Sequence, residues 1–391
     1  MHGRWCLHFI VALYASFVIG SGVVNAGEAS APPKRRILYN CDGNSCMFVK
    51  KDVYRPARLS EADFEAIADE LSYPGSQVDT LLLCINAQGT FYPSRVGTMV
   101  GALQSGEARD KWEPTSRQFV LNLEACYQKG IDPYAVVIKR AKERGLEVLL
   151  TFRMNDAHGN DFLRCKFWED NPDHRLGFGL DFGHQEVRDY TFALIAEAMH
   201  RYDCDGIELD FNRFPTFFKE GTPDERIEKI NELVKRVREM VTETGKHRGK
   251  SLIVAARVPT SPIQCREIGL APATWAEPRW IDFLTVAEFL TVDYSLPVAP
   301  WKQMISNIPI YGSIECVNAD RSGERLGYLS PEQYRRAARH LWNEGADGIY
   351  LFNFFCPREE GEKSFEPPFE VLQELGGLGN SKGHDNSPVA Q

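Results

Sequence analysis

The segment 205–212 places three polar side chains in a stretch that is otherwise apolar. Glu208, Asp210 and Asn212 are separated from one another by single apolar residues. A strand directs every second side chain to the same face, so these three groups share one face. Two carboxylates on one face of a buried strand are costly unless that face forms a site or an ion-paired core. We therefore predict that this strand lines a functional pocket.

Glu315 follows another apolar run, 308–314, and is expected to lie across the same pocket from Asp210. Two carboxylates that face each other can cleave a glycosidic bond, because one protonates the leaving oxygen while the other attacks carbon or activates water. We predict Asp210 as nucleophile or base and Glu315 as general acid. Glu208 would hold Asp210 through a charge network, and Glu288 is the reserve partner. The alternatives are a structural ion pair for Glu208 and a solvated loop position for Glu315.

Most of the other apolar runs also change to polar residues at their C-terminal ends, whereas their N-terminal ends show no such set. This asymmetry favours a site over a purely structural role. The residues predicted to bind substrate are Asp42, Asn86, Tyr92, Arg153, Asn155, His158, Asn212, Arg257, Glu288 and Asn353. Two inward arginines would suit an anionic glycan, because a guanidinium matches carboxylate or sulfate.

His158 and Asp156 offer a metal-binding alternative, which would need a carboxylate of the 205–212 strand to converge with them. Nothing in the spacing demands that convergence. We therefore predict no metal and no cofactor, and ordinary hydrogen bonding for His158.

The elements that must position these residues are eight apolar strands that alternate with helices. The strands are expected at 36–40, 78–85, 146–152, 205–212, 252–256, 281–286, 308–314 and 348–354. This alternation predicts one α/β domain, a single (β/α)8 TIM barrel with long loops after strands 2 and 3, whose site lies at the C-terminal ends of the strands. An open doubly wound sheet is the alternative, but no glycine-rich phosphate turn follows the first strand.

The N-terminus has the pattern of a secretory signal peptide, residues 1–26. Arg4 precedes an apolar core at 5–19, and Val24 to Ala26 fit a cleavage site. A linker at 27–35, a barrel domain at 36–376 and a disordered tail at 377–391 complete the expected organisation. The mature protein is predicted to be secreted or periplasmic, with no membrane span after signal removal. A retained anchor is the alternative.

The net charge and the cysteine count of the chain limit its binding partners and its disulfide bonding. The 391 residues carry a formal net charge of −9, which argues against nucleic acid or an anionic membrane as a partner. Nine cysteines follow the predicted signal peptide, an odd number, so at least one is unpaired within the chain. Cys41 and Cys46 are close enough in sequence to bridge, but a disulfide framework is not indicated. The sequence does not determine the oligomeric state.

Two segments, 150–156 and 205–211, resemble the third and fourth strands of secreted bacterial glycosyl-hydrolase-like barrel proteins, and Asn86 with 89–94 resembles their second-strand loop. The resemblance extends from Ile37 to about Phe355 and implies a TIM barrel with a carbohydrate-related role. The 205–212 strand also looks like the Asp-x-Asp-x-Glu strand of chitinase-type barrels. This chain has Asn212 where that family has its acid, so the resemblance does not imply substrate-assisted chemistry. Barrels with a nucleophilic Asp at the end of strand four are the closer analogy for Asp210.

These observations predict a secreted glycoside hydrolase that acts on a poly- or oligosaccharide. Asp210→Asn and Glu315→Gln are each expected to abolish hydrolysis and to leave the melting temperature nearly unchanged. The alternatives are a non-catalytic carbohydrate-binding barrel and a metal-dependent hydrolase that uses His158 and Asp156.

Overall fold

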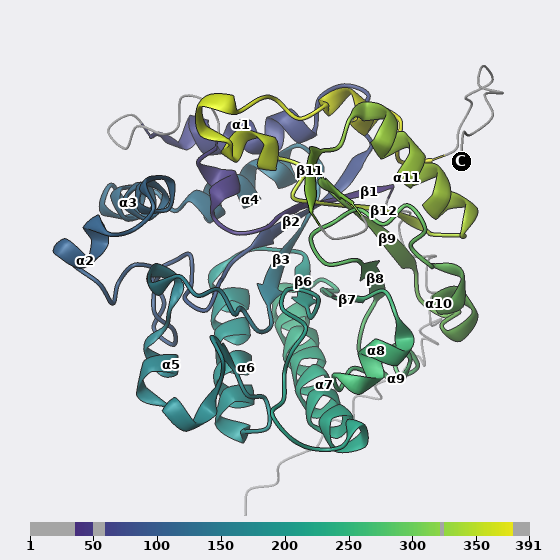
Figure 1. Ribbon diagram of the computed structural model, residues 1–391, viewed down its shortest axis with the longest axis horizontal. Coiled ribbons are helices and arrows are strands. Elements are labelled where there is room, and N and C mark those ends of the chain that lie inside the picture. Colours follow the sequence, from purple (N-terminus) through teal and green to yellow (C-terminus); the bar gives the residue numbers. More distant parts are fainter. Residues whose placement is uncertain (1–35, 50–58, 321–323, 378–391) are drawn as a thin grey trace, which may run out of the picture. The chain divides into compact units, whose positions relative to one another are not determined.

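Eight parallel strands form a closed barrel, which confirms the predicted (β/α)8 fold (Figure 1). The computed structural model describes residues 36–49, 59–320 and 324–377. In chain order the barrel strands are β1 (Ile37–Cys41), β2 (Val78–Cys84), β3 (Glu147–Arg153), β6 (Gly206–Asp210), β7 (Ile253–Pro259), β8 (Phe283–Ala287), β9 (Ile310–Glu315) and β12 (Gly348–Phe352). Each strand pairs with the next barrel strand in chain order, and β12 pairs with β1 to close the ring. The predicted strand 205–212 contains β6, the fourth barrel strand.

Helices surround this barrel, as the alternating pattern predicts. They are α1 (Glu61–Leu71), α2 (Glu107–Asp110), α3 (Pro114–Gln128), α4 (Pro133–Glu143), α5 (Lys166–Asp170), α6 (Gln185–Arg201), α7 (Pro223–Arg248), α8 (Pro262–Glu267), α9 (Pro272–Ala276), α10 (Ala299–Met304) and α11 (Pro331–Asn343). Within the described ranges, no helix combines the length and the apolar character that crossing a membrane would require.

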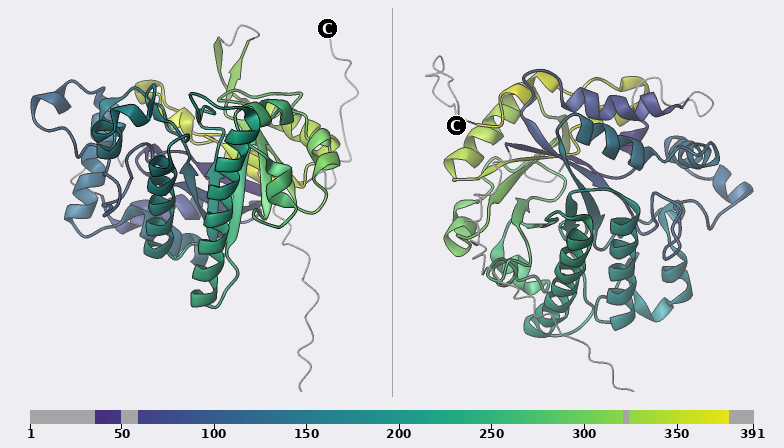
Figure 2. Two further views of the ribbon diagram at one scale, coloured as in Figure 1. Left: turned by 90° about the horizontal axis from the view of Figure 1, so that it is seen from below. Right: turned by 180° about the vertical axis from the view of Figure 1, so that it is seen from behind.

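Two barrel connections are long, as expected. The β2–α4 connection contains α2 and α3, and the β3–α6 connection contains α5 and the small hairpin of β4 (Arg175–Leu176) and β5 (Gly179–Leu180). A second hairpin, β10 (Val317–Ala319) and β11 (Arg325–Tyr328), follows β9 and projects from the barrel (Figure 2). Short 3-10 helices are η1 (Ser45–Met47), η3 (Asp161–Leu163), η4 (Pro172–His174), η5 (Cys356–Glu359), η6 (Gly361–Lys363) and η7 (Phe369–Gln373).

The barrel interior has an apolar layer with polar residues on the C-terminal side of it. The apolar layer is one cluster of buried side chains: Leu38, Leu82, Leu149, Ala255, Phe283, Tyr311, Tyr350 and Phe352. These residues alternate along their strands with residues that pack against the helices, because successive strand side chains point to opposite faces. The same alternation directs Glu208 and Asp210 of β6 into the barrel.

The predicted signal peptide, the linker and the tail beyond 377 lie outside the described residues, and the described residues all fall within the unit Lys34–Gln391. The nine cysteines of the described residues are free thiols. The Cys46 thiol is buried beside the Cys41 thiol, and this burial together with Cys41 raises the pKa of Cys46 well above its ordinary value. The two thiols predicted as a candidate bridge are therefore neighbours in their reduced form.

Candidate functional site

The first feature of the site is the carboxylate of Glu208 at mid-depth in the barrel. Its Oε1 accepts hydrogen bonds from the Thr151 hydroxyl at 3.0 Å and from the Tyr350 hydroxyl at 2.8 Å. The side chain is completely buried. Burial, reinforced by the negative charge of Asp210, raises the pKa of Glu208 to about 8. At neutral pH Glu208 is therefore largely a neutral carboxylic acid.

Arg257 of β7 joins the two carboxylates that the sequence analysis assigned to chemistry. Its Nη1 lies 3.2 Å from both carboxylate oxygens of Asp210, and its Nη2 donates to Oε1 of Glu315 at 2.7 Å. Asp210 also accepts the backbone N–H groups of Asn212 and Arg213, at 3.0 and 3.2 Å. Because β6 and β9 are separated by β7 and β8 in the ring, only barrel closure brings these side chains together.

The two carboxylates differ in their surroundings. Glu315 has one guanidinium contact and one hydroxyl donor, Ser313 at 3.1 Å, and it is 2% exposed. Burial raises the pKa of Glu315 to about 7, although Arg257 opposes this shift. Asp210 has four donor contacts in total, two from Nη1 of Arg257 and two from backbone amides. The site therefore holds one carboxyl group that can be protonated near neutral pH beside one that is surrounded by donors.

Several buried polar atoms in this layer have no hydrogen-bond partner among the described residues. They are Asn40 Oδ1, Glu208 Oε2, Arg257 Nε and Thr285 Oγ1. Buried polar atoms normally find a partner in protein or ordered water. The interior of the barrel thus keeps hydrogen-bonding capacity for water or for the hydroxyl groups of a ligand.

A second charged cluster lies beside the first, at the ends of β1 and β3. Arg153 donates from Nε to Asp42 and from Nη1 to Asp156, each at 2.8 Å. Nδ1 of His158 lies 2.9 Å from Asp156, and Nη2 of Arg213 lies 3.1 Å from Nε2 of His158. This pattern fits a neutral imidazole that donates from Nδ1 and accepts at Nε2.

Charge compensation dominates this second cluster. Burial alone would raise the pKa of Asp42, but Arg153 and Arg213 bring it below its usual value. Burial would likewise raise the pKa of Asp156, yet the hydrogen bond from His158 and the charge of Arg153 lower it. A metal ion at His158 would meet two guanidinium groups, so the electrostatics disfavour the metal-dependent alternative.

An open hollow of about 390 Å³ lies over this second cluster. Its lining includes Asp42, Arg153 and His158 together with Phe91 and Phe119. His158 is the partly accessible member, with 26% of its side chain exposed. Aromatic faces beside carboxylates and imidazole match the mixed surface of a sugar ring.

Side chains of the loops that follow β6 and β8 meet near the C-terminal ends of these strands. Phe214 lies 4.7 Å from the ring of His158 and 5.8 Å from the ring of Phe289, and the Arg213 guanidinium lies 5.1 Å from the Phe214 ring. Leu290 packs against the apolar layer inside the barrel. Phe214 and Leu290 have φ of 57° and 61°, a strained conformation for bulky side chains. Two strained residues thus lie just beyond the C-terminal ends of β6 and β8.

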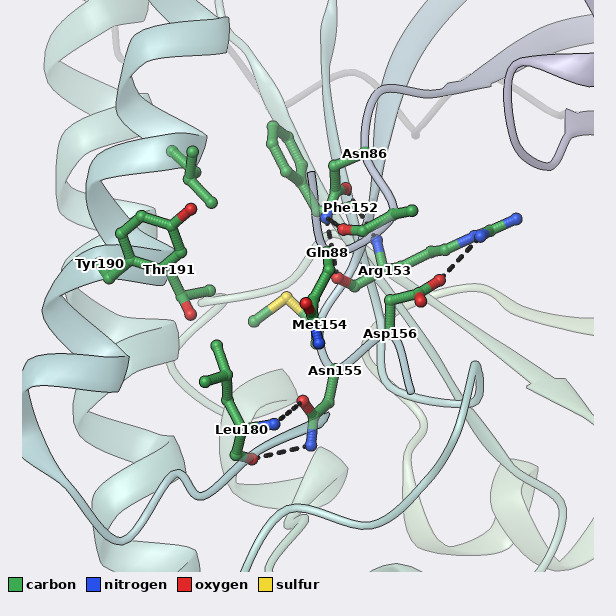
Figure 3. A pocket seen from close by; sticks show the side chains of 12 residues that line it. Asn86, Gln88, Phe152, Arg153, Met154, Asn155, Asp156, Leu180, Tyr190 and Thr191 are labelled. Atoms are coloured by element: carbon green, nitrogen blue, oxygen red, sulfur yellow. Dashed lines mark hydrogen bonds and ion pairs between the residues drawn. The ribbon is translucent and has the colours of Figure 1, made fainter. Parts of the chain in front are cut away.

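The side-chain amides of Asn86 and Asn155, which were predicted to bind substrate, form hydrogen bonds with backbone groups instead (Figure 3). Asn86 accepts the N–H of Arg153 at 3.2 Å and donates to its carbonyl at 3.1 Å. Asn155 accepts the N–H of Leu180 at 2.8 Å and donates to the carbonyls of Leu180 and Thr216, at 2.9 and 2.6 Å. Both amides therefore fix loop geometry around the end of β3.

The remaining predicted residues are spread over the mouth and its outer wall. Asn212 donates to the backbone carbonyl of Glu288 at 3.1 Å, which links the loops after β6 and β8. Asn353 follows β12 with a φ of 57° and is partly exposed. Tyr92 lies apart from the carboxylates, because its hydroxyl donates to Glu197 of α6 at 3.0 Å. The structure thus brings Glu208, Asp210, Arg257 and Glu315 together, places Asp42, Arg153 and His158 beside them, and puts Tyr92 on the helix side.

Sequence reasoning missed Tyr350, Ser313 and Arg213. Tyr350 lies in mid-strand within an apolar run, where only the strand alternation of β12 indicates that it points inward with Phe352. The Arg257 guanidinium lies 3.9 Å from the Phe352 ring, so this strand also contributes an aromatic face to the charged layer. Arg213 directly follows Asn212, and no local pattern predicts its contact with His158.

Solved structures with a fold similar to this chain include domains of glycoside hydrolases. The glycoside hydrolase domain of PgaB (BpsB) from Bordetella bronchiseptica matches with a TM-score of 0.52 and 12% identity, over 89% of this chain and 100% of that chain. Chitinase ChiW from Paenibacillus sp. str. FPU-7 matches with a TM-score of 0.47 and 13% identity, over 87% of this chain and 42% of that chain.

A glycoside hydrolase family 18 N-acetylglucosaminidase from Paenibacillus barengoltzii matches with a TM-score of 0.46 and 10% identity, over 87% of this chain and 99% of that chain. No protein-family model and no curated protein matches the sequence. At these identities the likeness shows the fold alone.

Proposed function

We propose that this protein is an exported glycoside hydrolase that cleaves glycosidic bonds in a poly- or oligosaccharide, with Asp210 and Glu315 as its catalytic carboxylates. The observation that carries the proposal is the convergence of Asp210 and Glu315 on the single guanidinium of Arg257 inside the barrel. The C-terminal side of a (β/α)8 barrel is where such enzymes place their chemistry. The barrel fold shared with the PgaB glycoside hydrolase domain supports the proposal by analogy.

The different surroundings of the two carboxylates support a division of roles. Glu315, whose pKa is raised to about 7, is the general acid that protonates the leaving oxygen. Asp210, which faces Arg257 and two backbone amides, is the carboxylate that attacks carbon or activates water. Glu208 is a positioning residue, because its contacts are with Thr151 and Tyr350 inside the barrel wall.

Substrate binding requires the mouth to open. Asp210 and Glu315 are 0% and 2% exposed, so the loops after β6 and β8, which carry Phe214, Phe289 and Leu290, would have to act as a movable cover. The strained φ angles of Phe214 and Leu290 favour release of this cover, because strain stored in the closed form lowers the free-energy difference from an open form. The glycan would then extend from the hollow over His158 toward Glu315.

A neutral glycan fits the charges better than an anionic one. Arg153 is paired with Asp42 and Asp156, and Arg257 is paired with Asp210 and Glu315. Both arginines are therefore neutralised by carboxylates of this chain. An anionic substituent would have to compete with these internal partners.

A non-catalytic carbohydrate-binding barrel is the second candidate, and the burial of both carboxylates favours it. In this alternative the Arg257 network only stabilises the barrel, and a sugar binds in the outer hollow beside His158 and Phe91. The two candidates predict different products from the same experiment, because only a hydrolase releases shortened saccharides.

The test is hydrolysis of a panel of neutral and acidic polysaccharides by the purified full chain, with products separated by chromatography. Asp210→Asn and Glu315→Gln should each lower the rate by roughly 10²–10⁴-fold, because each removes an acid–base or nucleophilic group. Asp224→Asn is the matched control, since Asp224 is an exposed residue in the first turn of α7. Full activity of the Asp210 variant would rule out the proposed mechanism, and glycan binding without products would select the second candidate.

A further inference from the structure

Three side chains with metal-ligand chemistry meet on the β3–α6 connection. His174 ends η4, His184 directly precedes α6, and Glu186 lies in the first turn of α6. One donor atom from each residue lies within 4.8 Å of the other two. The group is separate from the carboxylates inside the barrel, and the proposed function does not use it.

The backbone holds these residues close together. The N–H of Asp181 donates to the carbonyl of His174 at 2.8 Å, and the N–H of His184 donates to the carbonyl of Asp181 at 3.2 Å. Pairing of Arg175 with Leu180 closes the hairpin between them. The two imidazole rings consequently lie 4.3 Å apart between centroids.

The imidazoles have few other partners. Nδ1 of His174 is buried and has no hydrogen-bond partner among the described residues. Nε2 of His184 has an acidic neighbour in Asp181, but their separation of 3.8 Å is longer than a hydrogen bond. A buried ring nitrogen without a partner is unusual, so the imidazole of His174 retains unused hydrogen-bonding or ligand capacity.

We propose that His174, His184 and Glu186 form a binding site for a divalent transition metal, with Zn²⁺ as the ion that fits this donor set best. Imidazole nitrogen and carboxylate oxygen are standard zinc ligands at distances of about 2.0–2.2 Å. Tetrahedral coordination with such bonds separates the donor atoms by about 3.4 Å. The donor atoms, which lie within 4.8 Å of one another, would approach that spacing by side-chain rotation on binding, and a water molecule would complete the coordination.

Electrostatics at this place are mixed. The positive end of the α6 dipole opposes a cation, because the first turn of a helix favours negative charge. Glu186 as a ligand and Asp181 next to His184 supply negative charge that offsets the dipole. A softer nitrogen-binding metal is therefore favoured over Ca²⁺ or Mg²⁺, which prefer all-oxygen sites.

The expected consequence of binding is stabilisation of the β3–α6 connection. Leu180 precedes Asp181 and is clamped to Asn155 by two hydrogen bonds. A metal that ties His174 to the start of α6 would hold the same hairpin from its other side. Metal binding is thus expected to raise the melting temperature of the native protein, since a ligand that binds only the folded state stabilises it.

The test uses the full chain, purified without a histidine tag and stripped with a chelator. Titration with ZnCl₂ should show about one bound Zn²⁺ per chain, with a rise in melting temperature. His174→Ala and His184→Ala should each weaken binding by more than about 100-fold, because losing a direct ligand is more damaging than losing an outer-shell partner, whose loss costs roughly 10–100-fold. Glu186→Gln should weaken binding less severely and keep the fold.

His200→Ala is the matched control, because His200 is an exposed histidine on the same helix. It should bind Zn²⁺ as the unmodified protein does. The proposed site would be overturned if the stripped protein failed to bind Zn²⁺. It would also be overturned if the His174 and His184 variants bound Zn²⁺ as tightly as the unmodified protein does. Glycan hydrolysis is not a readout here, so the outcome is independent of the catalytic proposal.

Discussion

Arg257 is the residue that contacts both candidate catalytic carboxylates. The side chain is 1% exposed and contacts Asp210 and Glu315 at once. Removing a buried partner leaves an uncompensated charge, whereas removing an exposed partner has little effect. The central ion pair is therefore a stability element as well as a candidate catalytic one.

Arg257→Ala is expected to lower the free energy of unfolding by about 3–5 kcal/mol, because two buried carboxylates lose their cation. Urea denaturation monitored by circular dichroism measures this change. Arg236→Ala is the control, since Arg236 forms an exposed ion pair with Asp189 and should change stability by less than about 1 kcal/mol. Equal stability of the two variants would contradict the proposed contribution of the Arg257 ion pairs to the free energy of unfolding.

The same burial bears on one expectation drawn from the sequence, that Asp210→Asn and Glu315→Gln leave the melting temperature nearly unchanged. Both side chains are buried in contact with Arg257, so each substitution also removes a buried partner of that guanidinium. Activity assays on these variants therefore need a parallel measurement of the folded fraction.

At the scale of elements, β6 positions the site because it packs very closely on β7. Gly206 begins β6 and pairs with Ile253. A Cβ at Gly206 would lie 2.3 Å from the carbonyl oxygen of Ile253, which is backbone and cannot rotate away. Glycine is therefore required at the start of the strand that carries Glu208 and Asp210.

Gly206→Ala should destabilise the protein by roughly 1–3 kcal/mol, the usual range for overpacking a tight interior. It should also disturb the Asp210–Arg257 contact, because β6 must shift relative to β7. Thermal unfolding measures the first effect. Thr242→Ala, at an exposed position of α7, is the control and should leave the transition in place. A Gly206→Ala variant with the same unfolding temperature as the unmodified protein would show that β6 and β7 can move apart without loss of stability.

For the whole molecule, the raised pKa values of the buried acids determine how stability depends on pH. The folded state keeps protons on Glu208 up to about pH 8 and on Glu315 up to about pH 7, whereas the unfolded chain releases them near pH 4.5. Between these limits the folded state binds more protons, so stability must fall as the pH rises. Asp42 and Asp156, whose pKa values are lowered, act oppositely and remove stability only as the pH falls below about 3.8.

The protein should therefore be most stable in mildly acidic solution and lose stability steadily from about pH 4.5 to about pH 8. Chemical denaturation at a series of pH values measures this slope. Glu315→Gln should flatten it, because glutamine does not titrate. A stability maximum above pH 8 in the unmodified protein would contradict the assignment of buried protonated acids.

Local sequence features were sufficient to predict the barrel. Continuous apolar runs mark strands covered on both faces, and Ser60 and Thr222 are residue types that favour the N-cap positions they occupy in α1 and α7. Alternation in 205–212 was also sufficient to predict that Glu208 and Asp210 share a face. These features depend on interactions between residues close in the chain, so they can be read without knowing the fold.

Contacts between distant segments were decided only by the tertiary structure. Barrel closure places Glu315 and Asp210 on one guanidinium, and the paths of long loops direct Asn86 and Asn155 to backbone groups. The grouping of His174 with Glu186 depends likewise on a hairpin that brings η4 to α6. Strand alternation determines which side of the barrel wall a residue occupies, but ring closure and loop path determine which residue it meets there.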